Sequence, residues 1–136
     1  MNYTRIVLAA VAATIVDAVY GFIVYGNILT NQFAQYAGVY RPAATQAPYM
    51  PFLFGGILLA MLVAAAMYAK GFEGGIGVVE GFRFGMLVGF LMVGYSVLVN
   101  YAILNIGRRL TAYMGLSAIV EWAIAGIVIG LVYKKR

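Results

Sequence analysis

The sequence predicts an all-α integral membrane protein, a bundle of four transmembrane helices with both termini in the cytoplasm. Hydrophobic residues make up 65% of the 136 residues and charged residues only 10%, whereas a soluble domain carries about 25% charged residues. The apolar residues fall into four long runs, and a helix needs about 20 such residues to cross the hydrocarbon core of a bilayer. No polar stretch is long enough for a second core, so we expect one transmembrane domain over residues 1–136.

Each predicted span is bounded by polar, charged or glycine-rich segments. The first run contains Asp17 and is too long for a cleaved signal sequence. The second run opens after Pro51, in agreement with the preference of proline for the first turn of a helix. The predicted spans cover residues 6–25, 52–69, 84–106 and 114–133, and the long connection 27–50 forms an outer loop.

The basic residues set the predicted orientation, because lysine and arginine are enriched on the cytoplasmic side of a membrane protein. Four spans place both termini on one side. Of the nine basic residues, six fall on that side and three on the other. The six are Arg5, Lys70, Arg83, Lys134, Lys135 and Arg136, and the three are Arg41, Arg108 and Arg109.

Small residues spaced four apart mark the faces where helices should meet, because lipid tails are as apolar as leucine and close packing must hold the helices together. The last span has two such faces, one with Ser117 and Glu121 and one with glycines. A second face can serve a neighbouring subunit, or each helix can simply touch two others. The residues predicted to pack helices are Ala9, Ala13 and Gly21, Gly85 and Gly89, and Gly126 and Gly130.

Two carboxylates, Asp17 and Glu121, lie in the middle of apolar spans. At a rise of about 1.5 Å per residue, Asp17, Tyr95 and Glu121 each lie roughly 16–18 Å from the terminus-side end of their span. With Ser117 they are predicted to form one polar layer near the midplane. Tyrosines at span ends, including Tyr25, are instead assigned to the aromatic belts at the headgroups.

Three physical states could satisfy this acidic layer, and the sequence leaves all three open. The acids can be protonated, since no lysine or arginine lies near the centre of either span. Two close carboxyl groups can share one proton. A cation from outside, either an ion, a substrate or a basic residue of a partner, can neutralise them.

Histidine and cysteine are absent from the sequence. The first absence removes the commonest metal ligand and the usual haem ligand, and the second excludes thiol chemistry and disulfides. We therefore expect no catalytic residue, no metal and no cofactor. The net charge is +5, but the basic residues lie at span ends, so we expect contacts with the lipid bilayer and none with nucleic acid.

Residues 80–85, Glu-Gly-Phe-Arg-Phe-Gly, follow a glycine-rich connection and precede a glycine-spaced span. In this motif, over residues 70–89, and in its four-span layout, the chain resembles small bacterial integral membrane proteins of unknown function. The resemblance implies a multi-pass protein of the bacterial inner membrane and carries no activity with it.

The leading hypothesis from the sequence is a non-enzymatic membrane protein, either a homo-oligomer or an accessory subunit of a membrane complex. Its small-residue faces and acidic layer would then make contacts between helices. The alternative is a small proton- or cation-coupled transporter that uses Asp17 and Glu121 as exchangeable sites.

Overall fold

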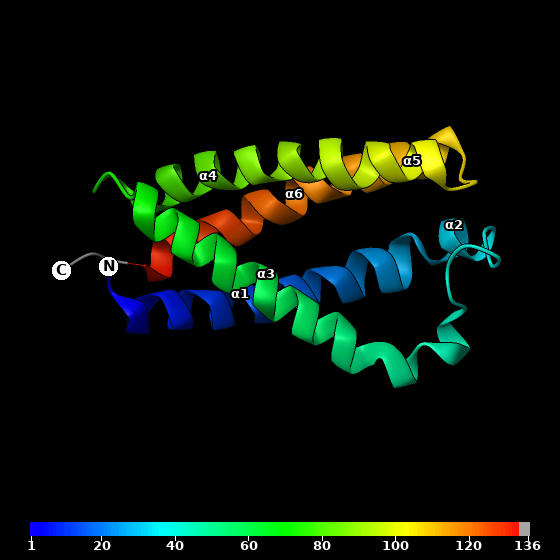
Figure 1. The fold of residues 1–136 in the computed structure, drawn as a ribbon, viewed down its shortest axis with the longest axis horizontal. Helices are drawn as coiled ribbons and strands as arrows, with labels where there is room; N and C mark the ends of the chain where they lie inside the picture. The colour runs from blue at the N-terminus through cyan, green and yellow to red at the C-terminus, as the bar shows by residue number, and fades with distance from the viewer. Residues whose placement is uncertain (134–136) are drawn as a thin grey trace.

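The computed structural model describes residues 1–133 as an all-helical protein, and it confirms the predicted four-helix fold (Figure 1). Within these residues, four helical segments are long and apolar enough to cross a membrane. Three of the basic residues that were counted to predict the orientation lie outside the described residues: Lys134, Lys135 and Arg136. The four segments run over Tyr3–Ile28, Ala47–Gly71, Gly77–Ile103 and Arg108–Val132.

The segments are built from shorter helical elements. The first joins α1 (Tyr3–Ile23) to a π-helical turn, Val24–Ile28, and a short helix α2 (Thr30–Ala34) follows. The second is α3 (Met50–Gly71), preceded by two 3-10 turns, Ala43–Thr45 and Ala47–Tyr49. The third joins α4 (Gly77–Met92), the π-helical turn Val93–Leu98 and α5 (Val99–Ile103), and the fourth is α6 (Arg108–Val132).

All four helical segments begin earlier than predicted, the third and the fourth by the largest margins. The third span starts at Gly77 and not at residue 84, and the fourth starts at Arg108 and not at residue 114. Hydropathy locates the apolar centre of a span, whereas charged residues can occupy its first turns. Glu80, for example, lies inside the first turn of α4, where its carboxylate accepts a hydrogen bond from the backbone N–H of Gly75 at 3.0 Å.

Both ends of the described chain lie on one side of the molecule, here called the terminus side. The backbone N–H of Asn2 lies 3.5 Å from the hydroxyl of Tyr133, and the Arg5 guanidinium donates to the Val132 carbonyl at 3.4 Å. The long connection around α2 lies at the opposite end, here called the loop side (Figure 1).

The loop side is closed by contacts from the long connection. The Tyr36 hydroxyl accepts a hydrogen bond from the backbone N–H of Gly107 at 3.0 Å, where the chain turns into α6. The Tyr40 hydroxyl contacts the sulfur of Met114 at 3.6 Å, and burial raises the pKa of Tyr40, which keeps this hydroxyl a donor. These contacts fix the connection against the start of α6.

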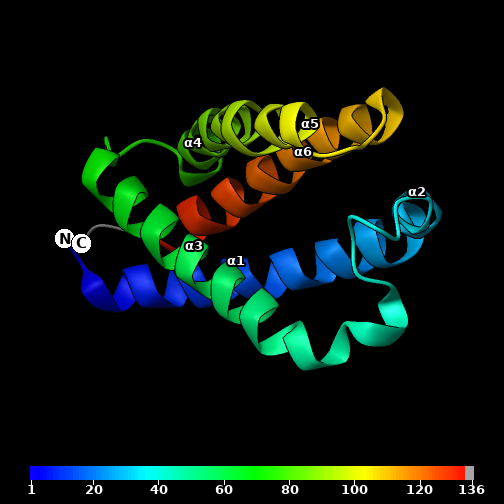
Figure 2. The same ribbon diagram turned by 45° about the vertical axis from the view of Figure 1, so that its right-hand side comes forward.

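The four helices pack as an open series. α4 lies along α6, α6 packs against α1, and α1 packs against α3. Near the terminus side α3 also approaches α4, because Tyr68 contacts Glu80 and the ring of Phe84. Toward the loop side, α3 diverges from α6 in both views (Figures 1 and 2).

Glycines make the contact between α4 and α6. A Cβ added to Gly81 would collide with the backbone carbonyl of Gly126, and one added to Gly85 would collide with the carbonyl of Trp122. The two helix backbones therefore touch, as small residues allow in membrane proteins. The glycines in this contact are Gly77, Gly81, Gly85 and Gly89 on α4 and Gly126 and Gly130 on α6.

Two of these glycines, Gly77 and Gly81, were not predicted from the sequence, because the third span was expected to begin after them. Gly21, in contrast, was predicted to pack against another helix and does not. A Cβ added there would meet, among the described residues, only the ring of Tyr25 on the same segment at 3.9 Å. Gly21 therefore lies on the predicted stripe of α1 without making a helix contact.

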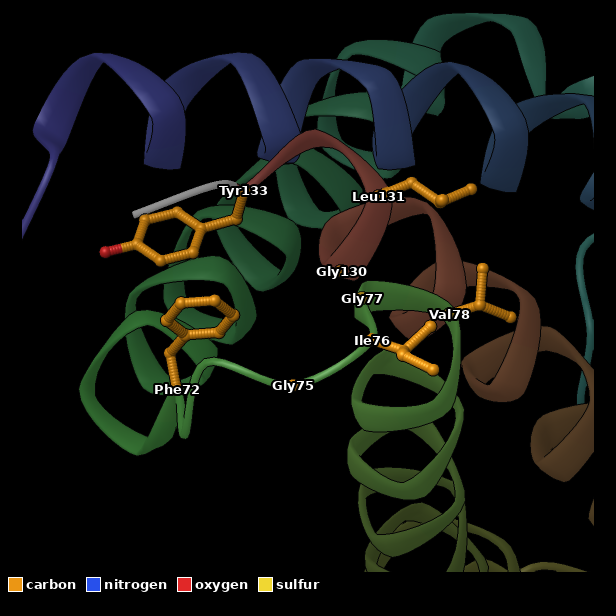
Figure 3. A pocket seen from close by; sticks show the side chains of 8 residues that line it. All are labelled: Phe72, Gly75, Ile76, Gly77, Val78, Gly130, Leu131 and Tyr133. Atoms are coloured by element: carbon orange, nitrogen blue, oxygen red, sulfur yellow. The ribbon is translucent and has the colours of Figure 1, made fainter. Parts of the chain in front are cut away.

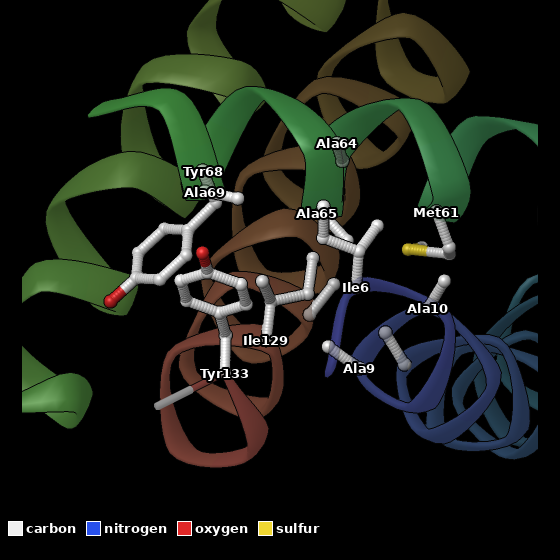
Figure 4. Close-up of a cluster of buried hydrophobic side chains, with 12 residues drawn as sticks. Ile6, Ala9, Ala10, Met61, Ala64, Ala65, Tyr68, Ala69, Ile129 and Tyr133 are labelled. Carbon is white, nitrogen blue, oxygen red and sulfur yellow. The ribbon is translucent and has the colours of Figure 1, made fainter. Parts of the chain in front are cut away.

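The contact of α1 with α3 and α6 forms the apolar core on the terminus side (Figure 4). Ala9 and Ala13 are completely buried, and the close approach that they allow brings Ile6 and Met61 together in one cluster. Tyr68 and Tyr133 were expected at the headgroups but lie inside this core, with ring centroids 6.0 Å apart.

We expect Gly81→Ala to lower the free energy of unfolding by about 1–3 kcal/mol, because the new methyl group must separate two backbones that touch. Gly55→Ala is the matched control. Gly55 lies inside α3 with no atom within 4 Å of an added Cβ, so this change should be neutral or stabilise by up to about 1 kcal/mol. Unfolding in mixed micelles, followed by circular dichroism, measures both, and equal effects would contradict the packing described here.

Candidate functional site

The two membrane acids come together at the contact between α1 and α6. Asp17 lies near the middle of the first segment, Tyr3–Ile28, and Glu121 lies midway along α6. Their carboxyl groups are within hydrogen-bonding reach of each other. Asp17 shares a helix face with the buried Ala9 and Ala13, and this face packs inward and carries Asp17 with it.

A network of hydroxyl groups surrounds Glu121. The Tyr25 hydroxyl donates to a carboxylate oxygen of Glu121 at 3.4 Å and accepts a hydrogen bond from the Ser117 hydroxyl at 2.9 Å. The Tyr20 hydroxyl donates to the backbone carbonyl of Ser117 at 3.0 Å. Ser117 thus joins the acids, as the predicted polar layer requires, and the two tyrosines extend that layer toward the loop side.

Tyr25 corrects the assignment to the aromatic belt. It is half-buried, and its hydroxyl points back to the bundle centre from the π-helical turn that ends the first segment. The sequence did carry a signal for this position. Tyr25 continues the four-residue spacing of Asp17 and Gly21 along the stripe of α1.

Tyr95 does not join the acids, which corrects the predicted layer. Its side chain is 76% exposed. The third segment faces α6 with its glycine stripe, and Tyr95 lies on another face of that segment. Its depth along the span is similar to that of the acids, but depth alone does not decide the direction in which a helical side chain points.

Neither acid has a counter-charge in the part of the chain that the structure describes. No salt bridge reaches Asp17 or Glu121 from residues 1–133. Asp17 is only 7% exposed, and the hydrogen-bonding partner of its carboxyl group among these residues is Glu121, itself an acid. Two carboxyl groups share a hydrogen bond only if one of them is protonated, and a buried carboxylate without a positive partner is strongly unfavourable, so the site requires a proton or a cation from elsewhere.

The acids open onto a groove of about 400 Å³ between α3 and α6. This volume falls within the range of small-molecule sites, about 300–1,000 Å³. The helices α3 and α6, which supply most of its lining residues, diverge toward the loop side (Figure 2). Apart from Asp17 and Glu121, its lining residues are apolar or glycine: Phe52, Leu53, Gly56, Ile57, Ala60, Met61 and Trp122.

A second hollow, of about 340 Å³, lies near the terminus side (Figure 3). It is lined by Phe72, Ile76 and Tyr133, and by glycines and aliphatic residues between them. None of the residues that line it is acidic or basic, so the groove at Asp17 and Glu121 is the candidate site.

The chemistry of the pair is that of oxygen ligands and proton acceptors. Two carboxyl groups and the Tyr25 hydroxyl are the polar groups that meet there. Among residues 1–133, no group of three or more histidine, cysteine, aspartate or glutamate side chains comes together. The arrangement is able to hold protons or one cationic group.

Comparison with family models, curated proteins and solved structures returned no match to this chain. The functional conclusion therefore depends on the geometry of the site.

We expect Tyr25→Phe to destabilise the folded protein by about 1 kcal/mol, since the change removes the donor to Glu121 and the acceptor that lies 2.9 Å from the Ser117 hydroxyl. Tyr95→Phe removes the same atom from an exposed side chain and should leave stability unchanged. Unfolding of the three proteins in mixed micelles distinguishes them. A Tyr25→Phe protein as stable as Tyr95→Phe would show that the network does not hold the site.

Proposed function

We propose that this chain is a non-enzymatic membrane transporter that exchanges protons or cations at the Asp17–Glu121 pair. The observation that supports this proposal is the position of the pair. Two carboxyl groups that have no counter-charge among the described residues, a buried Asp17 and a half-buried Glu121, line a groove in the middle of their spans. Ionisable groups inside a membrane are costly, and they mark ion pathways and proton relays.

The surroundings of the acids favour binding over catalysis. Ser117, the serine of this network, donates its proton to Tyr25 and has no histidine or lysine beside it in the described network. Nucleophilic catalysis requires an adjacent base to activate such a hydroxyl. A pair that holds and releases a cation has no such requirement.

The proposal includes an orientation and a membrane. The excess of basic residues on the terminus side supports cytoplasmic termini, and the resemblance of residues 80–85 to bacterial membrane proteins supports the bacterial inner membrane. The groove would then open toward the outer leaflet, since it extends from the acids to Phe52 near the loop-side end of α3.

A second candidate function is the accessory subunit or homo-oligomer favoured by the sequence. The open groove supports it, because a transmembrane helix of a partner could fill the space between α3 and α6 and neutralise the acids with a lysine or arginine. We rank it second because the groove has the volume of a small-molecule site. The two functions share the same two acids.

Asp17→Asn and Glu121→Gln should each abolish proton- or cation-driven flux in proteoliposomes, because neither amide can take up or release a proton. A carbodiimide that modifies protonated carboxyl groups in apolar surroundings should label the wild-type pair, and each variant should lose the label at its changed position. No lysine or arginine is among the residues that line the groove, so no basic side chain there competes for the reagent.

Glu73→Gln is the matched control, because Glu73 is an exposed acid in the connection before α4. Its flux and labelling should equal those of the wild type. Circular dichroism confirms that each variant is folded. Wild-type protein that resists the carbodiimide, or flux that persists in both Asp17→Asn and Glu121→Gln, would refute the proposed function.

A further inference from the structure

We propose that the groove binds a small organic cation, with one positive charge and an apolar body, which places its charge at Asp17 and its body along α3. This inference rests on the proposed function and names the class of ligand at the same site.

The charge of the ligand follows from Asp17. Asp17 is 7% exposed and lines the groove, and its hydrogen-bonding partner in the described chain is Glu121, itself an acid. Glu121, beside it, already accepts a hydrogen bond from Tyr25. Asp17 contacts no hydroxyl or amide donor among the described residues, so it keeps acceptor positions for a cation in the groove that it lines.

The apolar body of the ligand follows from the walls. Calcium takes 6–8 oxygen ligands, and magnesium keeps several waters in an octahedral shell. The groove presents two carboxyl groups against walls of Phe52, Ile57 and Met61. A calcium or magnesium ion would lose water there without enough oxygen ligands to replace it, whereas an organic cation brings apolar groups that the walls can bury.

Trp122 supplies a second feature that suits an organic cation. It lines the groove directly after Glu121 in α6. The face of a tryptophan ring attracts ammonium groups more strongly than any other aromatic side chain. The carboxylate of Asp17 and the indole of Trp122 together favour a weakly hydrated cation.

The groove also gives such a ligand a route from the bilayer. Its lining extends along α3 from Met61 to Phe52, which is about 14 Å at the rise of an α-helix. Phe52 is 78% exposed at the loop-side end. A cation with an apolar body, dissolved in the loop-side leaflet of the bilayer, would reach Asp17 along α3 without crossing an aqueous pore.

The test uses Trp122 as its reporter, because it is the only tryptophan in the sequence. The full chain in nanodiscs is titrated with benzyltrimethylammonium, and its tryptophan emission is recorded. Neopentylbenzene, which has carbon in place of the charged nitrogen, is the neutral control, and sodium chloride is the inorganic control. Equilibrium dialysis with radiolabelled benzyltrimethylammonium measures binding independently of fluorescence.

We expect saturable binding of benzyltrimethylammonium that weakens by about tenfold or more in Asp17→Asn, the loss that follows removal of a buried charge partner. Glu73→Gln should bind like the wild type. Binding should also protect Asp17 from the carbodiimide. Absence of saturable binding by dialysis, equal binding of neopentylbenzene, or unchanged affinity in a folded Asp17→Asn protein would each overturn the inference.

The two proposals fail in different ways. If the carbodiimide labels the pair and flux depends on Asp17, but benzyltrimethylammonium does not bind, only the ligand class is wrong and the pair serves protons or inorganic ions. If labelling and acid-dependent flux are also absent, the proposed function itself is wrong.

Discussion

The close approach of α4 to α6 is the contact on which the rest of the structure depends. Glycines let the two backbones touch along one face of α6, and this leaves a different face, with Ser117 and Glu121, free to meet α1. Because α1 presents Asp17 on its own small-residue face, the second contact brings the two acids together. A larger residue in the glycine contact would shift α6 and with it the carboxyl group of Glu121.

The groove is a consequence of how α3 is held. Its terminus-side half packs on α1 through small residues and reaches α4 through Tyr68, whereas its loop-side half diverges from α6 (Figures 1 and 2). The divergence leaves a groove beside Phe52 and Met61 that both acids line. A fully closed bundle would have buried them between helices and left them a purely structural role.

The sequence predicted the fold because hydropathy and length identify spanning helices without knowledge of their packing. It also located Asp17, Ser117 and Glu121, since spacing along one helix defines a face. It misplaced Tyr95 because depth does not determine direction, and it missed Gly81 because the span was expected to start too late. The groove was not predictable, since it depends on the tilt of α3 relative to α6.

The central claim is that Asp17 and Glu121 interact directly, and a double-mutant cycle on unfolding free energy tests it most directly. Asp17→Asn, Glu121→Gln and the double variant are compared with the wild type in mixed micelles. Contacting residues show coupling energies of about 0.5–3 kcal/mol, whereas distant sites add within about 0.5 kcal/mol. We predict coupling above that limit. Additive effects of the two changes would show that the acids do not meet and would contradict the site described here.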